Sequence, residues 1–118
     1  MSFYEPYSEL SQEAKSLDSA IASLMEELEA TNWYHQRYET ASDSDLKEIM
    51  LHNRDEEIEH CAMLIEWLRR NVPEFDRELR AYLFTDDRLT EVEASVTAAG
   101  SSGPPARNSL GIGSLRGR

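Results

Sequence analysis

Apolar residues recur along the first part of the chain in alternating steps of four and three. This file comprises Leu10, Ala14, Leu17, Ile21, Leu24 and Leu28. The spacing places them on one face of an α-helix that packs against another helix. We expect this helix to begin after Pro6, with Ser8 as its N-cap, and to end near Thr40, before the sequence ASDSD.

A second file with the same spacing predicts another long helix, which extends to about Asn71. Its members are Leu46, Met50, Asn53, Glu57, His60, Leu64 and Trp67. Ser42 followed by Asp45 resembles a capping box, and Pro73 ends the helix because the residue before a proline avoids helical dihedral angles. The ends of the file are apolar and its middle is polar. A buried carboxylate needs a compensating charge, so the middle of this interface is either wet or positively charged.

Shorter elements follow the two long helices. The sequence PEFDRELRAYLF, which opens with Pro73, predicts a short third helix, and LTEVEASV predicts a fourth helical piece. From Thr97 the chain is rich in small residues, Gly, Pro and Ser, as linkers are. The expected organisation is a helical domain at 1–96, a flexible linker at 97–108 and a terminal peptide at 109–118.

These elements predict an all-α fold built on a two-helix antiparallel hairpin plus a short C-terminal helix. Two helices of about 30 residues, at about 1.5 Å per residue, make a hairpin about 45 Å long. A lone hairpin buries only one face of each helix, and stable bundles usually contain four helices. A second apolar strip, Leu51, Ile58 and Ile65, lies beside the first on the second helix. We therefore expect dimerisation to complete a four-helix bundle.

The charge balance narrows the possible partners. The chain has 12 basic and 23 acidic residues, a net charge of −11, and every acidic residue lies within 5–93. An acidic body argues against nucleic-acid binding, which needs a basic face, and it suits metal cations or simply solubility. The longest apolar run, Cys61–Ile65, is too short to span a membrane. With one cysteine and no secretory core at its N-terminus, the sequence favours a cytoplasmic protein.

The polar middle of the second file contains Glu57 and His60, a Glu-x-x-His sequence. Residues three apart project from the same helix face, one turn apart. A carboxylate and an imidazole together are ligands for iron, manganese or zinc. The alternatives are a charged pair on a wet surface and a glutamate–histidine hydrogen bond across a helix interface. Their position inside the apolar file strengthens the interpretation as a metal site.

Glu27 is the candidate partner on the first helix. It lies one helical file from Leu24 and Leu28, at the edge of the expected buried face, where it either reaches water or joins the site. Ferritin-like di-iron sites take one Glu from each of two helices and one Glu-x-x-His from each of the other two. One chain supplies half of that set. A second copy would therefore complete both the bundle and a site for two cations.

Several spaced sequences resemble the encapsulated ferritins, the ferritin-like cargo proteins of encapsulin nanocompartments. They are MEELEATNWYHQR, HNRDEEIEHCAMLIEWLRRN and RAYLFT, and the resemblance covers about residues 8–90. It implies a ferritin-like fold and a ferroxidase that oxidises Fe(II) with dioxygen at a di-iron centre on the dimer interface. It also implies a ring-shaped decamer that has no cavity of its own for storing mineral.

The resemblance further implies roles for individual residues. The ligands of its di-iron centre correspond to Glu27, Glu57 and His60, with Tyr34 beside them. A secondary metal site on the path of incoming iron corresponds to Glu26, Glu29 and Trp33. Judged from the sequence alone, those two glutamates are typical of a solvated acidic face. Cys61 stands where we expect the family to have alanine, and a thiol beside iron and oxygen is open to oxidation.

The terminal peptide resembles the sequences that dock cargo on the inner wall of an encapsulin shell. SLGIGSL offers three apolar anchors, Leu110, Ile112 and Leu115, and a flexible linker precedes it. The resemblance therefore implies an encapsulin shell protein as partner and a location inside that shell. The alternative is a disordered tail with chance leucines.

Two other functions are compatible with the sequence. An acidic helical adaptor without metal would recruit a partner through its tail, although Glu57 and His60 inside the interface argue against it. Another ferritin-like enzyme, either a peroxidase or a manganese-dependent one, would use the same carboxylate and imidazole ligands. Iron-dependent oxygen uptake, measured alongside mass in solution, distinguishes these functions from a ferroxidase.

Overall fold

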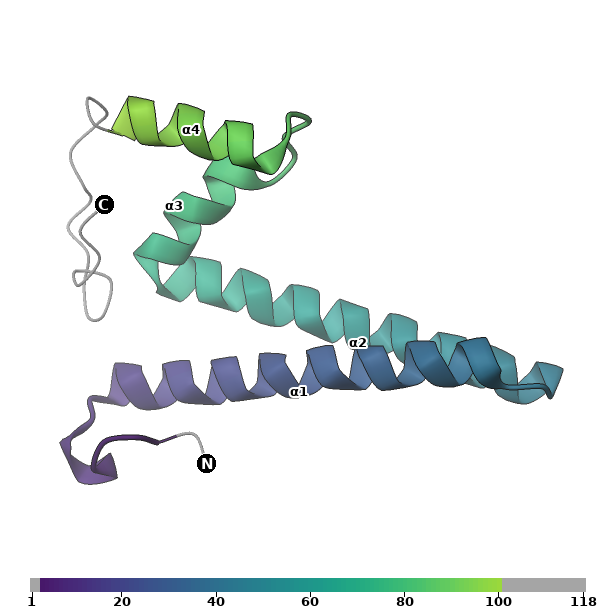
Figure 1. The fold of residues 1–118 in the computed structure, drawn as a ribbon. Helices are drawn as coiled ribbons and strands as arrows, with labels where there is room; N and C mark the ends of the chain where they lie inside the picture. The colour runs from purple at the N-terminus through teal and green to yellow at the C-terminus, as the bar shows by residue number, and fades with distance from the viewer. Residues whose placement is uncertain (1–2, 101–118) are drawn as a thin grey trace. The chain divides into compact units, whose positions relative to one another are not determined.

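The structure, a computed structural model, describes residues 3–100, with side chains described as far as residue 98. Its elements in chain order are the 3-10 helix η1 (Tyr7–Glu9) and the α-helices α1 (Gln12–Thr40), α2 (Ser44–Asn71), α3 (Pro73–Tyr82) and α4 (Leu89–Gly100) (Figure 1). No strand occurs between residues 3 and 100, which confirms the predicted all-α class. The chain divides into two compact units at the Trp67/Leu68 boundary within α2, and each unit is described by itself.

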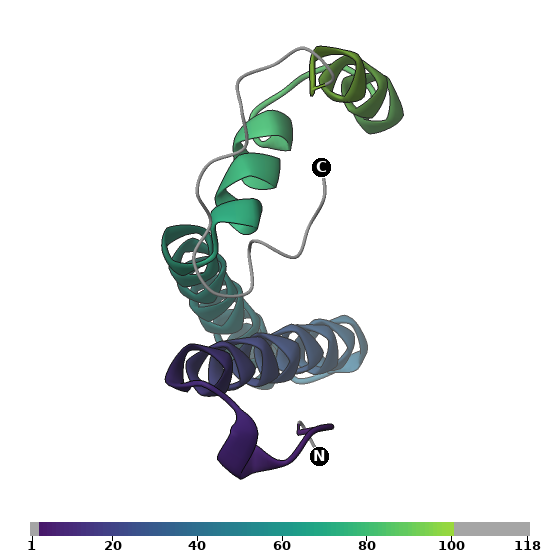
Figure 2. The same ribbon diagram turned by 90° about the vertical axis from the view of Figure 1, so that its left-hand side faces the viewer.

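The first unit is an antiparallel helical hairpin. α1 and α2 run beside each other in both views (Figures 1 and 2). Near the turn, Lys47 Nζ donates a hydrogen bond to the Tyr38 carbonyl at 2.8 Å. Farther from the turn, His60 Nδ1 lies 3.0 Å from Glu27 Oε2. Residues later in α2 thus contact residues earlier in α1, as in an antiparallel pair. The predicted antiparallel pairing is confirmed.

α1 begins later than its sequence suggested. Ser8, the expected N-cap, lies within η1. The N-cap is Ser11, whose side chain accepts a hydrogen bond from the Ala14 backbone N–H at 3.1 Å. The expectation for Ser8 is wrong because Pro6, with its fixed φ, opens a separate 3-10 turn before the helix starts. The helix ends at Thr40, as predicted.

The cap of α2 also differs from the expected capping box. Asp43 Oδ2 accepts a hydrogen bond from the Leu46 backbone N–H at 2.9 Å, so Asp43 caps this helix in place of Ser42. A carboxylate at this position also interacts favourably with the positive end of the helix dipole, an advantage that a neutral serine hydroxyl lacks. The helix ends at Asn71, as predicted.

The buried face of α1 is rotated from the predicted apolar file. Two members of that file, Ile21 and Leu28, are 38% and 53% exposed, whereas Ala20 is 7% exposed. A line that is buried or half-buried throughout runs through Leu17, Ala20, Leu24, Glu27, Thr31 and Tyr34. The sequence pattern missed this line because Glu27 and Thr31 are polar and do not count toward an apolar file. Glu27 therefore lies within the buried face and not at its edge.

The hairpin leaves many apolar side chains exposed. Exposed large apolar residues of this unit include Met25, Leu28, Leu46, Ile49, Ile58, Met63 and Ile65. The buried apolar residues between positions 3 and 67 are Ala20 and Cys61, both with small side chains. Soluble monomers rarely leave large apolar patches open to water. An excess of exposed over buried apolar side chains is typical of a subunit of an oligomer and not of a self-contained domain.

The second unit contains the end of α2 from Leu68, followed by α3 and α4. Its buried residues, within positions 68–98, are Leu68, Val72, Glu74 and Val92. α3 and α4 contact each other. Asp76 of α3 accepts a hydrogen bond from Arg69 and another from Arg80 at 2.8 Å. The first of these bonds ties α3 to the end of α2.

Both short helices end at places that were not predicted. α3 ends at Tyr82 and not at Phe84, because Leu83 already has an extended backbone, with ψ of 141°, and Phe84 follows with a left-handed φ of 60°. Phe84 is also 99% exposed. α4 runs to Gly100, past Thr97, where the linker was expected to begin. The rest of that linker, 101–108, and the terminal peptide, 109–118, lie outside the described residues.

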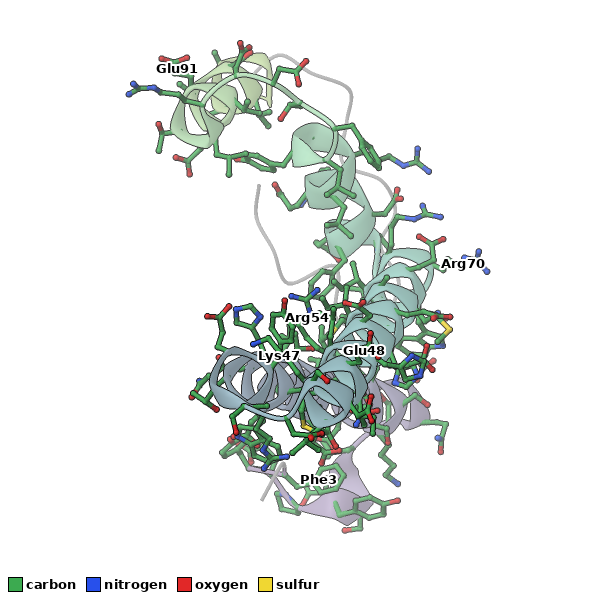
Figure 3. All side chains as sticks on the ribbon, turned by 90° about the vertical axis from the view of Figure 1, so that its right-hand side faces the viewer. Phe3, Lys47, Glu48, Arg54, Arg70 and Glu91 are labelled. Carbon is green, nitrogen blue, oxygen red and sulfur yellow. The ribbon has the colours of Figure 1, made fainter. Side chains whose placement is uncertain are left out.

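Charged side chains project from the helices of both units. Figure 3 shows Arg70 on α2 and Glu91 on α4 extending outward, and both residues are exposed. Most acidic residues of the described part of the chain are exposed, so water can reach the side chains that carry most of the acidic excess. No helix between residues 3 and 100 is both long enough and apolar enough to span a membrane.

Candidate metal centre

Three potential ligands meet between α1 and α2. Glu27 comes from α1, and Glu57 and His60 come from α2. Each offers one ligand atom, and these atoms all lie within 4.8 Å of one another. His60 Nδ1 lies 3.0 Å from Glu27 Oε2 and 3.1 Å from Glu57 Oε1. The fold therefore brings together, within one chain, the three residues that the sequence singled out.

Helix geometry explains why these side chains converge. Glu57 and His60 are one turn apart on the same face of α2, and Glu27 belongs to the buried line of α1. The side chains of Glu27 and Glu57 are 27% and 20% exposed, and that of His60 is 42% exposed. The carboxylates are thus partly shielded from water, and the imidazole is the most accessible of the three groups.

The two carboxyl groups shift each other's pKa in opposite directions. A hydrogen bond with Glu27 raises the pKa of Glu57, and burial raises it further. The same hydrogen bond lowers the pKa of Glu27. Of the two carboxyl groups, Glu57 therefore holds a proton to the higher pH. Hydrogen bonds with Glu27 and then with Glu57 raise the pKa of His60.

The donor set of this cluster fits a metal ion. Ligands lose their protons as metal binds, so a divalent cation would replace any proton that this cluster holds. Carboxylate oxygens and an imidazole nitrogen are ligands for iron, manganese and zinc. No other group of three or more Asp, Glu, His and Cys side chains at such distances occurs in the described part of the chain.

Two further residues adjoin the cluster. Thr31 Oγ1 donates a hydrogen bond to the Glu27 backbone carbonyl at 2.8 Å. Cys61, the neighbour of His60, has its Sγ 4.0 Å from the same hydroxyl oxygen and is 6% exposed. The sequence drew attention to Cys61 only as a site of oxidation and passed over Thr31. The available signal was its position four residues after Glu27, on the same face of the helix.

Tyr34, the residue expected beside the centre, is half-buried about two turns after Glu27. Its ring centre lies 5.4 Å from the guanidinium carbon of Arg37. The ring contact that the structure shows for Tyr34 is this cation–π pair, which lies on α1 itself.

The residues of the expected secondary metal site are exposed side chains of α1. Glu26 and Glu29 line one open pocket of about 400 Å³, together with Asp18 and Met25. Trp33 is 48% exposed and does not line that pocket. Both glutamates are exposed, as the alternative of a solvated acidic face predicts. The expected docking residues lie outside the described part of the chain: Leu110, Ile112 and Leu115.

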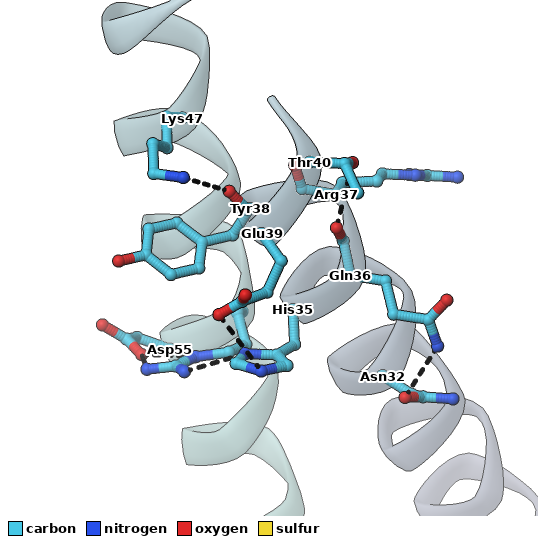
Figure 4. Close-up of polar contacts among 10 residues, drawn as sticks. Asn32, His35, Gln36, Arg37, Tyr38, Glu39, Thr40, Lys47 and Asp55 are labelled. Carbon is cyan, nitrogen blue, oxygen red and sulfur yellow. Dashed lines mark hydrogen bonds and ion pairs between the residues drawn. The ribbon is translucent and has the colours of Figure 1, made fainter. Parts of the chain in front are cut away.

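A polar network joins α1 and α2 near the turn of the hairpin. Arg54 Nη1 lies 3.2 Å from His35 Nδ1 (Figure 4). The Lys47 ammonium, which donates to the Tyr38 carbonyl, also lies 4.6 Å from the centre of the Tyr38 ring. α1 and α2 continue without interruption from this network to the cluster. The network therefore helps to decide which turns of the two helices face each other at the candidate ligands, and it was not predicted.

Comparison with known proteins assigns the family. The EncFtn-like family model matches residues 2–86 of the chain. The chain belongs to the EncFtn-like family. A ferritin-like protein of Thermotoga maritima is 52% identical over 99 residues, which make up 84% of this chain and 86% of that protein. An encapsulated ferritin-like protein of Rhodospirillum rubrum is 48% identical and covers 98% of this chain and 89% of its own length.

A solved structure supports the same assignment. The crystal structure of protein ne0167 from Nitrosomonas europaea superposes with a TM-score of 0.72 and is 52% identical, covering 75% of this chain and 97% of its own. The predicted resemblance to the encapsulated ferritins and the predicted ferritin-like fold are both confirmed. This EncFtn-like chain is therefore a ferritin-like protein with a candidate metal site between its two long helices.

Proposed function

We propose that this EncFtn-like chain is a ferroxidase, which oxidises Fe(II) to Fe(III) and passes the electrons to dioxygen. The observation that carries the proposal is the convergence of Glu27, Glu57 and His60, whose ligand atoms lie within 4.8 Å of one another. Ferritin-like di-iron sites are built from this combination of carboxylates and imidazole. The names of the ferritin-like relatives support iron as the metal.

The proposed di-iron centre is shared between two copies of the chain. One chain offers two carboxylates and one imidazole, half of the ligand set of a ferritin-like di-iron site. A homodimer would supply the other half and close a four-helix bundle. The exposed apolar residues Met25, Ile58 and Met63 give a second copy surface to bury. The resemblance to the encapsulated ferritins extends this assembly to a ring-shaped decamer.

The ligands would act through charge and orientation. Glu27 and Glu57 bring negative charge that offsets the cations, and the metal in turn removes the cost of holding these carboxylates together. His60 Nδ1 points at both carboxylates, so it adds a nitrogen ligand once its proton has left. Iron, when bound, supplies the redox chemistry by giving up electrons to dioxygen.

Other residues would serve the same reaction from outside the centre. Glu26 and Glu29 are open to solvent and carry charge that attracts incoming Fe(II). With Trp33 they form the proposed secondary metal site on the path of iron. Tyr34 is the proposed neighbour of the di-iron centre, a role that requires the second copy to approach its ring.

We also propose that the protein works inside an encapsulin shell in the cytoplasm. The Rhodospirillum rubrum relative is named an encapsulated ferritin-like protein and matches 98% of this chain. The terminal peptide at 109–118 would dock on the shell through Leu110, Ile112 and Leu115. The shell would then hold the ferric product.

Oxygen uptake tests the proposed reaction. Fe(II) is added to the metal-free protein, and the initial rate of dioxygen consumption is compared between the wild type, Glu57→Ala and His60→Ala. Each variant should lose at least about tenfold in rate, since it lacks a metal ligand. Glu59→Ala and His52→Ala are matched controls, because both residues are exposed on α2. They should keep the wild-type rate.

The outcomes separate the alternatives. Wild-type rates in both ligand variants would mean that iron is oxidised elsewhere. Turnover with Mn(II) or with hydrogen peroxide, but not with Fe(II) and dioxygen, would favour the manganese-dependent enzyme or the peroxidase. A chain that binds no metal would be the acidic helical adaptor.

A further inference from the structure

Thr31 and Cys61 meet across the hairpin directly beside the candidate ligands. Thr31 lies one helical turn after Glu27 on α1, and Cys61 immediately follows His60 on α2. Thr31 Oγ1 is 2.8 Å from the Glu27 carbonyl oxygen and 4.0 Å from Cys61 Sγ. A single hydroxyl therefore touches the backbone of one candidate ligand and the side chain that adjoins another.

The directions of these contacts follow from the chemistry of the groups. A threonine hydroxyl has one hydrogen, and a backbone carbonyl can only accept. The hydrogen of Thr31 is therefore directed at the Glu27 carbonyl. The contact with Cys61 then has one available donor, the thiol S–H, which is a weak donor with a large sulfur atom. The resulting chain runs from the Cys61 thiol to the Thr31 hydroxyl and on to the Glu27 carbonyl.

This contact involves one of the few buried apolar side chains of the hairpin. Cys61 is 6% exposed, and Ala20 is the only other buried apolar residue between positions 3 and 67. Cys61 is buried and Thr31 is half-buried, whereas the candidate ligands next to them are partly open to water. A small side chain at this position lets the two helix backbones approach each other. The contact between Thr31 and Cys61 therefore joins α1 and α2 directly beside the cluster.

We propose that Thr31 and Cys61 are a positioning pair that sets the distance between Glu27 and His60 for metal binding. The inference rests on the proposed metal centre. Metal–ligand distances are fixed to within about 0.2 Å, so a small change in helix separation changes metal affinity. Groups that orient ligands from outside the metal's own coordination typically contribute about 10- to 100-fold to metal affinity.

The test measures binding of Co²⁺, a coloured divalent probe that is stable in air, to the metal-free full-length protein. Thr31→Val keeps the shape of the side chain and removes the hydroxyl, and its affinity should fall by about tenfold or more. Thr31→Ser restores the hydroxyl and should return affinity to within about threefold of the wild type. The absorption bands of bound Co²⁺ should shift in the valine variant and return in the serine variant.

Thr40 provides a matched control. Its hydroxyl donates to the Gln36 carbonyl at 3.1 Å, the same local bond that Thr31 makes, but at the exposed end of α1. Thr40→Val should therefore leave Co²⁺ affinity and absorption unchanged. A role of Thr31 in helix stability alone would lower the melting temperature of both valine variants and alter Co²⁺ binding in neither.

A double-mutant cycle tests whether the two residues act as a pair. Cys61→Ala should also weaken Co²⁺ binding, and Thr31→Val combined with Cys61→Ala should lose clearly less than the product of the two single losses. Independent, multiplying losses would overturn the pairing, and wild-type affinity in Thr31→Val would overturn the positioning role. If the wild-type chain binds no Co²⁺, the metal centre itself is wrong and the inference fails with it.

Discussion

His60 on α2 and Glu27 on α1 are joined across the hairpin, with Nδ1 of one 3.0 Å from Oε2 of the other. The two residues are 33 positions apart in the chain, so the contact exists only when both long helices have formed and aligned. Charged groups within a helix interface cost stability unless their charges are balanced. Whatever balances the cluster therefore also stabilises the pairing of the helices.

Removal of metal is expected to weaken the association of subunits. Without cations, the carboxylates of two chains would face each other across the proposed interface and repel. Chelation should lower the mass in solution, measured by sedimentation, and readdition of Fe(II) without air or of Co²⁺ should restore it. An unchanged mass after complete removal of metal would contradict a metal-dependent interface.

Glu57→Gln separates repulsion from loss of metal. The substitution removes one carboxylate per chain while it keeps the size of the side chain, so the metal-free variant should associate more strongly than the metal-free wild type. Glu59→Gln, at an exposed position of α2, should behave as the wild type does. Equal dissociation of all three metal-free proteins would show that charge repulsion at the centre does not govern assembly.

Ser11 and Ser8 should differ in their effect on stability. Ser11 caps α1 by accepting the Ala14 N–H, and loss of such a cap costs about 1 kcal/mol. Ser11→Ala should therefore lower the free energy of unfolding by about that amount, as measured by denaturant titration at fixed metal and protein concentration. Ser8→Ala is the control, expected within about 0.5 kcal/mol of the wild type. If Ser8→Ala were instead the more destabilising of the two substitutions, Ser8 would be the N-cap, as the sequence suggested.

These caps show what the sequence could and could not specify. Thr40 and Asn71 were predicted as helix ends because the breaking signals that follow them act locally. The starts were misplaced because several serines and aspartates lie close together before each helix, and side-chain type alone does not tell which one has the extended backbone that a cap requires. In the structure, Ser8 is part of η1 and does not cap α1, whose N-cap is Ser11.

Asp76 should make stability depend on pH in the acid range. Burial alone would raise the pKa of Asp76, but hydrogen bonds from Arg69 and Arg80 outweigh it, and the pKa is lowered from its usual 3.8. Because the folded state favours the charged form, the contribution is complete above about pH 3.8 and is lost as the pH falls through the lowered value. Asp76→Asn should therefore cost about 1 kcal/mol near neutral pH.

The pH profile of that variant provides the decisive comparison. The difference in free energy of unfolding between the wild type and Asp76→Asn should shrink as the pH falls below about 3.8. Asp86→Asn, at an exposed position after α3, should match the wild type throughout. A gap that stays constant from neutral to acid pH would mean that the side chain acts through packing and not through its charge.

The terminal peptide is expected to act as an address and not as part of the catalyst. A chain that ends at Gly100 keeps the whole of α4, so it should retain its oligomer and its Fe(II)-dependent oxygen uptake but fail to co-purify inside an encapsulin shell. Leu110→Asp combined with Leu115→Asp should reproduce that failure in the full-length chain. Ser101→Asp with Ser102→Asp adds the same charge within the linker and should be loaded normally.

The sequence predicted the charged residues of the candidate site but not the uncharged residue Thr31 that adjoins them. Glu57 and His60 stood out because polar residues interrupted an apolar file, a signal that needs only helical periodicity. Thr31 did not stand out in this way, since a threonine within a helix usually has only a packing role. Its role depends on which residue of α2 lies opposite. Contacts such as that of Arg54 with His35 contribute to this register, and periodicity cannot supply it.

The connection between the two long helices has a consequence for the order of assembly. Only Ala41, Ser42 and Asp43 lie between α1 and α2, so closing the hairpin loses little chain entropy. Local topologies of this kind form quickly, on a timescale that does not depend on protein concentration. Each newly made chain would therefore arrange Glu27, Glu57 and His60 before it encounters a second copy. Assembly would then join two half-centres that are already formed, and subunit concentration would control how fast complete sites appear.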